Sequence, residues 1–275
     1  MLSDARLLEV AGRLVEVPGV RAVVLGGSRA RGDHTAESDV DLGLYYRPPL
    51  DVDALGAAVR DLAGPEARVS APGEWGPWVD GGGWLRVDGT AVDVIYRDLE
   101  RVRRSWQDAQ EGRFAWHAQA GHPLGVPSFA YAGEIALAVV LADPSGEVTA
   151  LHEEAAAYPP ALRDAVVGGL WEAAFSLDVA AKAVGRGDAA YVAGCLFRAV
   201  LLCAHALHAH AGRWVTNEKG AVAAAGRLPG APRDLGERAQ ALCAAVGVKP
   251  DALRATLAAA HVLVDETVAA CGEAS

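Results

Sequence analysis

A glycine–serine turn and a pair of aspartates are the residues of this chain whose types and spacing point to chemistry. An apolar run, residues 20–25, leads into Gly27 and Ser28, and a second apolar run carries Asp39 and Asp41. Residues two positions apart on a strand project from the same face, so both carboxylates are expected side by side. Neighbouring carboxylates repel each other unless a cation lies between them, and a divalent metal is the usual cation.

A third aspartate, Asp93, stands between Val92 and Val94 in a later apolar run. Three such carboxylates would hold Mg²⁺, and two ions can share them, one activating the attacking oxygen and one neutralising the leaving pyrophosphate. Gly27 lets the backbone approach a phosphate closely, while the Ser28 hydroxyl and the free amides of the next turn can bind phosphate oxygens. The pattern predicts a nucleoside triphosphate held through Mg²⁺ and transfer of a nucleotidyl group.

The order Gly27-Ser28, then Asp39-x-Asp41, then a lone Asp93 closely resembles the polymerase-β-like nucleotidyltransferase superfamily. That resemblance covers roughly the first hundred residues. It implies that Asp39, Asp41 and Asp93 bind metal and act in catalysis, with Asp93 on a strand beside the other two. Gly27, Ser28 and Arg29 would then form the turn that seats the triphosphate.

The second half is similar, more loosely, to the helical domains of small bacterial nucleotidyltransferases, including antibiotic adenylyltransferases. The segments that carry this likeness are residues 131–134, 175–182 and 217–220. The resemblance implies a two-domain enzyme that moves AMP from ATP onto a hydroxyl of a small molecule. The acceptor would bind against the helical domain, and an aminoglycoside is one candidate by analogy.

Three further residues are candidates for the site. Lys182 and Lys219 are two of the chain's three lysines, and either could contact the triphosphate as a point charge or simply be solvated on a helix. Glu134 lies in an apolar stretch and could take the proton of the acceptor hydroxyl, or it could be structural. Asp93 could serve as that base instead while also touching metal.

The composition narrows the class of substrate. A net charge of −10 argues against binding DNA or long RNA, because nucleic-acid affinity comes from neutralising phosphates, and it suits a cationic or neutral small molecule better. The charged amino terminus is unlike a secretory signal, and no apolar run of membrane-spanning length is evident, so we expect a cytoplasmic protein with no membrane partner. The four cysteines form no metal-ligand spacing and are expected as reduced core thiols.

Hydrophobic periodicity and turn residues predict an α+β chain. Strands are expected at 20–25, 38–46, 84–87 and 91–96, and an Asp88-Gly89 hairpin turn joins the last two. Helices are expected at 3–17, 51–64, 98–106, 160–186, 188–211, 233–246 and 251–271. Two shorter helical segments are also expected, one capped by Ser28 and one that starts at 216 or 217. Residues 131–141 are ambiguous. We therefore expect a mixed-sheet nucleotidyltransferase domain over 1–126, an all-helical acceptor and nucleotide-clamping domain over 127–275, and a cleft between them.

Several alternatives stay open on the sequence. The chain could adenylylate a protein partner, as toxin–antitoxin nucleotidyltransferases do, or be a nucleotide sensor without activity; RNA tailing is disfavoured by the acidic charge. The Gly-, Pro- and Trp-rich stretch 64–83 could be a substrate lid or a variable surface loop. His205 and His208 share a helix face and could bind zinc, although core histidines are commoner. The acceptor, the nucleotide base and the oligomeric state are not encoded in any pattern found.

Overall fold

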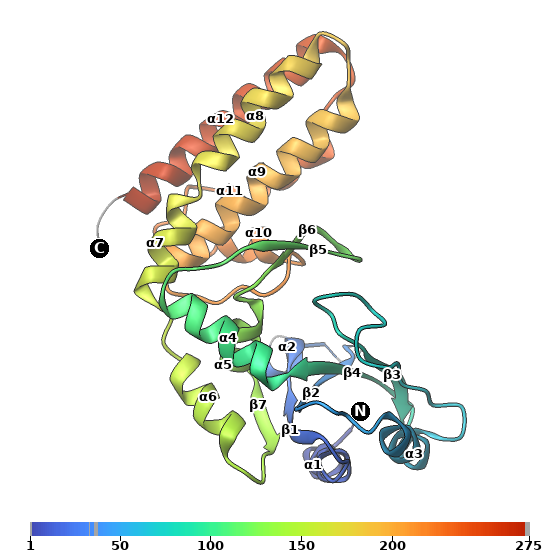
Figure 1. Ribbon diagram of the computed structural model, residues 1–275. Coiled ribbons are helices and arrows are strands. Elements are labelled where there is room, and N and C mark those ends of the chain that lie inside the picture. Colours follow the sequence, from blue (N-terminus) through green and yellow to red (C-terminus); the bar gives the residue numbers. More distant parts are fainter. Residues whose placement is uncertain (1, 33, 36–37, 273–275) are drawn as a thin grey trace. The chain divides into compact units, whose positions relative to one another are not determined.

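The structure is a computed structural model that describes residues 2–32, 34–35 and 38–272 (Figure 1). The chain folds into two compact units. Unit 1 comprises Met1–Asp108 and His117–Ala157, and unit 2 comprises Ala109–Trp116 and Tyr158–Ser275. The α+β class is confirmed, because the first unit combines a mixed sheet with helices and the second is helical.

Unit 1 is built on a mixed sheet whose described strands lie in the order β3-β4-β2-β1-β7. Their bounds are Val20–Leu25 for β1, Val40–Tyr46 for β2, Gly82–Val87 for β3, Thr90–Asp98 for β4 and Val139–Ala142 for β7. Strands β2 and β4 run parallel, and the other neighbouring pairs are antiparallel. The expected Asp88-Gly89 turn joins β3 to β4, and both residues have positive φ, as a tight hairpin requires.

One face of this sheet is the hydrophobic core of unit 1. Alternate residues of β2 and β4, such as Leu42 and Val94, are fully buried there. Helices α1 (Asp4–Val15) and α3 (Val52–Ala63) cover this face, with α1 packed on β1 and β7 and α3 packed on β3 (Figure 1). Because side chains alternate along a strand, Asp41 and Asp93 project from the opposite face.

Side-chain caps begin the helices of unit 1 where the sequence predicts them. Ser3 accepts from the Arg6 amide, Asp51 from the Ala54 amide and Asp98 from the Glu100 amide, at 3.3, 2.9 and 2.9 Å. The remaining helices of this part are α2 (Gly27–Arg31), α4 (Leu99–Gln110), α5 (Ala130–Leu137) and α6 (Glu147–Ala155). A two-stranded ribbon, β5 (Trp116–Gln119) with β6 (His122–Pro127), was not expected from the sequence.

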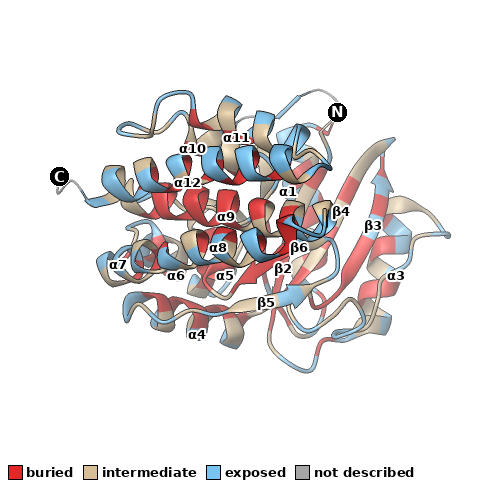
Figure 2. Ribbon diagram, turned by 90° about the horizontal axis from the view of Figure 1, so that it is seen from above, coloured by how far each residue is buried: buried red, intermediate tan, exposed pale blue. Residues whose placement is uncertain are grey.

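Unit 2 packs its helices around α9 (Ala189–His210). The other helices are α7 (Pro160–Gly168), α8 (Trp171–Val184), α10 (Ala221–Ala225), α11 (Leu235–Ala244) and α12 (Pro250–Gly272). Helix α9 lies between α8 and α12 and is largely buried (Figure 2). Its apolar window has a mean hydropathy of 1.7, enough by length and composition to cross a membrane. This corrects the expectation of no such run; the helix is apolar on most sides because it is the core helix of unit 2.

The two compact units divide the chain differently from the expected boundary at 126/127. Residues 127–157 belong with unit 1, because β7 pairs with β1 at the edge of the sheet and α5 carries the partner of a buried arginine on β4. Local composition does not reveal such a return, since the pairing of β1 with β7 joins residues more than a hundred positions apart.

Local predictions also differ from the structure in further details: helix α6 was not expected, and the short helix expected from 216 or 217 begins at Ala221. The helix expected over 160–186 is broken between α7 and α8 at Gly168 and Gly169, residues that weaken helices. Gly26, not Ser28, is the N-cap of α2. Strand β2 begins at Val40, so Asp39 directly precedes it, whereas the sequence pattern predicts a strand from residue 38.

The ion pair between Arg97 on β4 and Glu134 on α5 ties the outer face of the sheet to the following helix. The Nε and Nη2 atoms of the guanidinium donate to the two carboxylate oxygens, at 2.5 and 2.8 Å, and Arg97 also lies over the Tyr131 ring. Burial alone would lower the pKa of Arg97, but attraction to Glu134 outweighs it and raises that pKa above its ordinary value. This guanidinium depends on its partner, because an unpaired buried charge is strongly unfavourable.

We therefore predict that Glu134→Ala lowers the free energy of unfolding by about 3 kcal/mol, since it leaves Arg97 buried without its counter-charge. The control is Glu172→Ala, which removes the partner of Arg198; the Arg198 side chain is 36% exposed, against 8% for Arg97, so this loss should cost about 1 kcal/mol or less. Urea denaturation of both variants measures the difference. Equal losses would contradict the assignment of Glu134 as a structural anchor.

Candidate active site

A row of residues crosses the outer face of the sheet in unit 1. Asp41 on β2 and Asp93 on β4 are direct neighbours in the parallel register, and Trp84 on β3 is the antiparallel partner of Asp93. On the other side of Asp41, the Gly26 amide donates to the Asp41 carbonyl at 2.8 Å. The register therefore brings together the glycine–serine turn and two of the three aspartates expected in the site.

Gly27 lies against the Asp41 carboxylate. A Cβ built on Gly27 would come within 1.7 Å of Asp41 Oδ2, and Gly27 has a φ of +62°. Both facts require glycine, because no side chain fits the space and L-residues disfavour this backbone region. Ser28, the next residue, lies in the short helix α2 with its amide near the same turn. The carboxylate and the expected phosphate-binding backbone are thus in direct contact.

Arg29 anchors the segment that carries Asp39. Its guanidinium donates to the Ser38 carbonyl at 2.6 Å and to the Asp39 carbonyl at 3.1 Å. Asp39 itself is exposed, immediately before β2. Arg29 therefore positions the backbone of Asp39, in addition to the triphosphate contact proposed for it.

The ionised carboxylates at this site repel one another. Partial burial, then repulsion from Asp41 and from Asp39, raises the pKa of Asp93 above that of an ordinary aspartate. A divalent cation relieves such repulsion, and carboxylate oxygens are the ligands that Mg²⁺ prefers. In the described residues no three His, Cys, Asp or Glu side chains converge on one point, so the fit rests on the paired Asp41 and Asp93 with Asp39 nearby.

The other expected site residues lie on other elements of the chain. Glu134 is on α5, where Arg97 takes both of its carboxylate oxygens. Lys182, in the last turn of α8, and Lys219, before α10, are exposed residues of unit 2. Arg198, on α9, donates to the Glu172 carboxylate at 2.5 Å.

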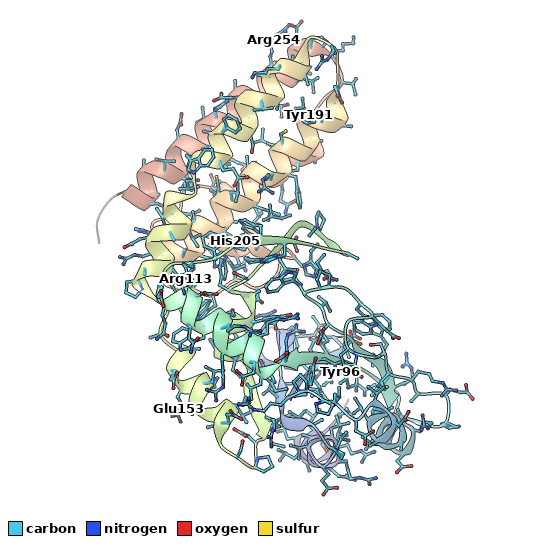
Figure 3. The ribbon with its side chains drawn as sticks, in the orientation of Figure 1. Tyr96, Arg113, Glu153, Tyr191, His205 and Arg254 are labelled. Carbon is cyan, nitrogen blue, oxygen red and sulfur yellow. The ribbon has the colours of Figure 1, made fainter. Side chains whose placement is uncertain are left out.

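The histidines of α9 are core residues of unit 2. Burial lowers the pKa of His205 to about 3 and also lowers the pKa of His208. The His205 ring meets Trp116 edge to face at 4.9 Å, near the end of α9 (Figure 3). Within the described residues neither histidine belongs to a metal-binding group of three.

The stretch 64–83 is held in place at several points. The Gln119 side chain donates to the Trp75 carbonyl at 2.9 Å and accepts from the Val79 amide at 3.1 Å. The Trp78 ring stacks on His117 at 3.8 Å, and the Tyr131 hydroxyl donates to the Trp78 carbonyl. The sequence did not point to Gln119, because a single glutamine belongs to no recognisable motif. Only the high density of tryptophans in residues 64–83 indicated that this stretch could be held in place.

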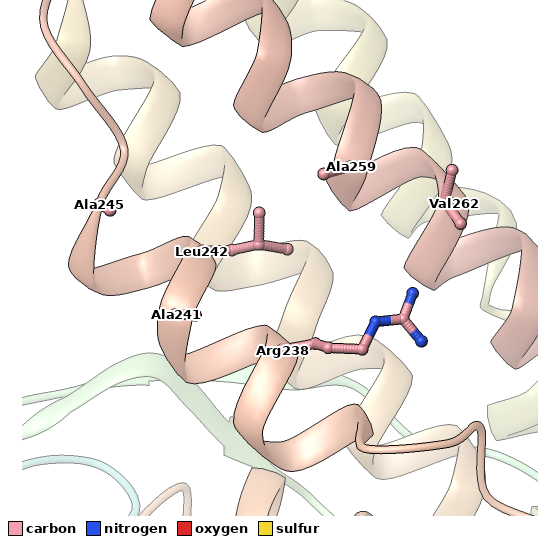
Figure 4. A pocket seen from close by; sticks show the side chains of 6 residues that line it. All are labelled: Arg238, Ala241, Leu242, Ala245, Ala259 and Val262. Carbon is pink, nitrogen blue, oxygen red and sulfur yellow. The ribbon is translucent and has the colours of Figure 1, made fainter.

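Unit 2 contains a cavity of about 440 Å³ between α11 and α12 (Figure 4). Its lining is Arg238, Ala241, Leu242, Ala245, Ala259 and Val262. The one charged member, Arg238, is paired with Glu266 at 2.5 Å. The cavity includes none of the residues expected to take part in nucleotidyl transfer.

Comparison with known proteins agrees with the geometry of unit 1. Residues 6–80 match the family model described as "Nucleotidyltransferase domain". This part of the chain is therefore similar to a nucleotidyltransferase domain. The matched residues include Gly27, Ser28, Asp39 and Asp41, while Asp93 lies beyond them.

A solved structure of a nucleotidyltransferase-like protein from Exiguobacterium sibiricum 255-15 is similar to this chain, with 12% identity and a TM-score of 0.46. The similarity covers 93% of this chain and 72% of the other. No curated protein matches the sequence. The match over residues 6–80 supports nucleotidyl transfer as the activity.

The contact between Gly27 and Asp41 gives a first test of this site. Gly27→Ala should destabilise the protein and reduce nucleotidyl transfer, because the new methyl group displaces the Asp41 carboxylate. Gly32→Ala is the matched control: Gly32 also has a positive φ, +75°, but nothing lies within 4 Å of its Cβ position. The control should cost only the backbone strain, about 1–2 kcal/mol. Equal effects in thermal unfolding and transfer assays would show that the contact is unimportant.

The raised pKa of Asp93 gives a second test. The folded chain holds this proton more tightly than the unfolded chain, so ionisation of Asp93 reduces stability as the pH rises through its pKa. Asp93→Asn should therefore raise the thermal midpoint of the metal-free protein at pH 7, with a gain that shrinks toward pH 4, near the ordinary aspartate pKa of about 4. Asp53→Asn, at an exposed position of α3, should show no gain. A pH-independent difference would contradict the repulsion.

Proposed function

We propose that this enzyme transfers AMP from ATP to a hydroxyl group of a small, cationic molecule, with Mg²⁺ as its metal. The observation that carries the proposal is the row on the outer face of the sheet, where Gly27 touches the Asp41 carboxylate and Asp41 adjoins Asp93. The row joins a phosphate-compatible turn to a metal-compatible pair of carboxylates. Nucleotidyl transfer requires both at one place.

Asp41 and Asp93, with Asp39 beside them, would hold one or two Mg²⁺ ions, which supply positive charge to the triphosphate and lower the pKa of the attacking hydroxyl. Gly27 and Ser28 would seat the phosphates, and Arg29 keeps the Asp39 backbone in place through its two carbonyl contacts. Lys182 and Lys219 remain proposed triphosphate contacts. Retention of the wild-type ATP KM after their replacement by methionine would remove them from the site.

Asp93 is the better proposed general base. Both oxygens of Glu134 are occupied by Arg97, whereas Asp93 lies in the row itself, next to Asp41, where the acceptor hydroxyl would arrive. The Asp93 carboxylate would take the hydroxyl proton, the acceptor oxygen would bond to the α-phosphorus, and the bond to pyrophosphate would break. Glu134 then acts by holding Arg97.

The net charge of the chain suggests the class of acceptor, and its cysteine thiols suggest the compartment in which the enzyme works. The net charge of −10 favours a cationic acceptor, of which an aminoglycoside-like antibiotic is an example, over a nucleic acid. A role in antibiotic resistance is part of this proposal. We place the reaction in the cytoplasm, in keeping with four cysteines that are all unpaired thiols.

We predict that Asp41→Asn and Asp93→Asn each lower AMP transfer by at least about a thousandfold, because they remove charge that stabilises the transition state. Asp53→Asn is the control and should keep wild-type turnover. The assay incubates each variant with labelled nucleoside triphosphates, Mg²⁺ and a panel of aminoglycosides and lincosamides. Wild-type turnover in either site variant would overturn the assignment, and product with another base would correct the choice of ATP.

A further inference from the structure

Two stacked tryptophans stand at the edge of the sheet beside the carboxylate row. Trp84 on β3 is 71% exposed, and the Trp75 ring stacks on it with centroids 4.3 Å apart and planes 15° apart. Large aromatic side chains gain stability by burial, so an indole left this open contributes little to folding. A stack of this kind presents flat, electron-rich surface to a ligand.

The register places the stack on a defined side of the site. Across the sheet the order is the Gly27 turn, Asp41, Asp93 and then Trp84. With the triphosphate at the glycine–serine turn, Trp84 lies on the far side of Asp93, where the attacking group must approach. The tryptophans therefore adjoin the acceptor and not the phosphates.

The stretch that carries Trp75 is built to hold it. Gln119 donates to the Trp75 carbonyl, and the Ser70 hydroxyl accepts from the Gly82 amide at 2.9 Å beneath the stack. Gly82 packs against the neighbouring strand and the Trp75 ring, since a Cβ there would lie 1.9 Å from the Val94 carbonyl oxygen and 3.1 Å from the ring. A surface ordered before binding loses less entropy when a ligand arrives.

The charges around the stack favour a cation. Asp93 is the cross-strand neighbour of Trp84, and Glu74, exposed, directly precedes Trp75. Indole faces attract ammonium groups. The cation on this part of the strand is Arg86, whose guanidinium donates to the Gly89 carbonyl at the hairpin turn, 2.7 Å away.

We propose that the Trp75–Trp84 stack is the acceptor-binding surface of this enzyme and that it selects small ring compounds bearing protonated amines. One flat side of the acceptor packs on the indoles, its ammonium groups face Asp93 and Glu74, and its hydroxyl is directed to Asp93. This inference rests on the proposed function, because the position of the triphosphate defines the acceptor side.

The test compares Trp84→Ala with Trp171→Ala in the full chain. Trp171, on α8, is 66% exposed and lies in unit 2, so its loss controls for removing an open tryptophan. Calorimetry measures binding of neomycin, a polyamine sugar, with the neutral trisaccharide raffinose for comparison. Thermal shift with MgATP on the same samples reports the nucleotide site separately.

Trp84→Ala should weaken neomycin binding about tenfold, in line with a lost cation–π contact, and leave the MgATP shift unchanged. Trp84→Phe should restore most of the affinity, and Trp171→Ala should change neither measurement. Any one of three results would overturn the inference. These are an unaltered neomycin affinity in Trp84→Ala, no binding of neomycin by the wild type, and binding of raffinose as tight as that of neomycin. Loss of the MgATP shift in Trp84→Ala alone would assign the stack to the nucleobase. A wild type without any MgATP shift would instead refute the proposed function, whatever neomycin does.

Discussion

The close approach of Gly27 to the Asp41 carboxylate is the constraint around which unit 1 is arranged. The contact leaves no room for a side chain at residue 27, and it places a negative charge against backbone that is otherwise suited to phosphate. The parallel pairing of β2 with β4 then sets Asp93 beside Asp41, which raises the pKa of Asp93. Without a cation this arrangement is electrostatically unfavourable, and such stored repulsion is typical of sites that bind metal and polyphosphate.

The inner face of the sheet contributes to stability, and the outer face carries the candidate active site. The inner face is buried under α1 and α3, and its alternating aliphatic side chains fix the register of the strands. On the outer face the far end of β4 is closed by the Arg97–Glu134 pair, four residues beyond Asp93. The ion pair therefore covers the part of β4 around Arg97, while Asp93 and Asp41 lie outside the region that it covers.

At the edge strand β3, the segment that carries the tryptophan stack has both a structural and a proposed binding role. An edge strand exposes unpaired backbone and is commonly protected by charge or by a covering loop. Here the stretch before β3 runs beside it, held by Gln119 and Tyr131, and lays Trp75 over Trp84. The same segment therefore covers the edge of the sheet and presents an aromatic surface next to Asp93.

The sequence by itself determined the α+β class, the strand ending at the glycine–serine turn, the hairpin at Asp88-Gly89 and the starts of α1, α3 and α4, because these depend on periodicity and on local hydrogen bonds. Only the tertiary structure decided that Glu134 pairs with Arg97, that residues 127–157 complete unit 1 and that Gly27 touches Asp41. It also put Trp84 next to Asp93 and revealed the anchoring glutamine, Gln119. The physical reason is that each of these depends on strand register and on contacts between distant segments, which burial of the inner face imposes and no local pattern encodes.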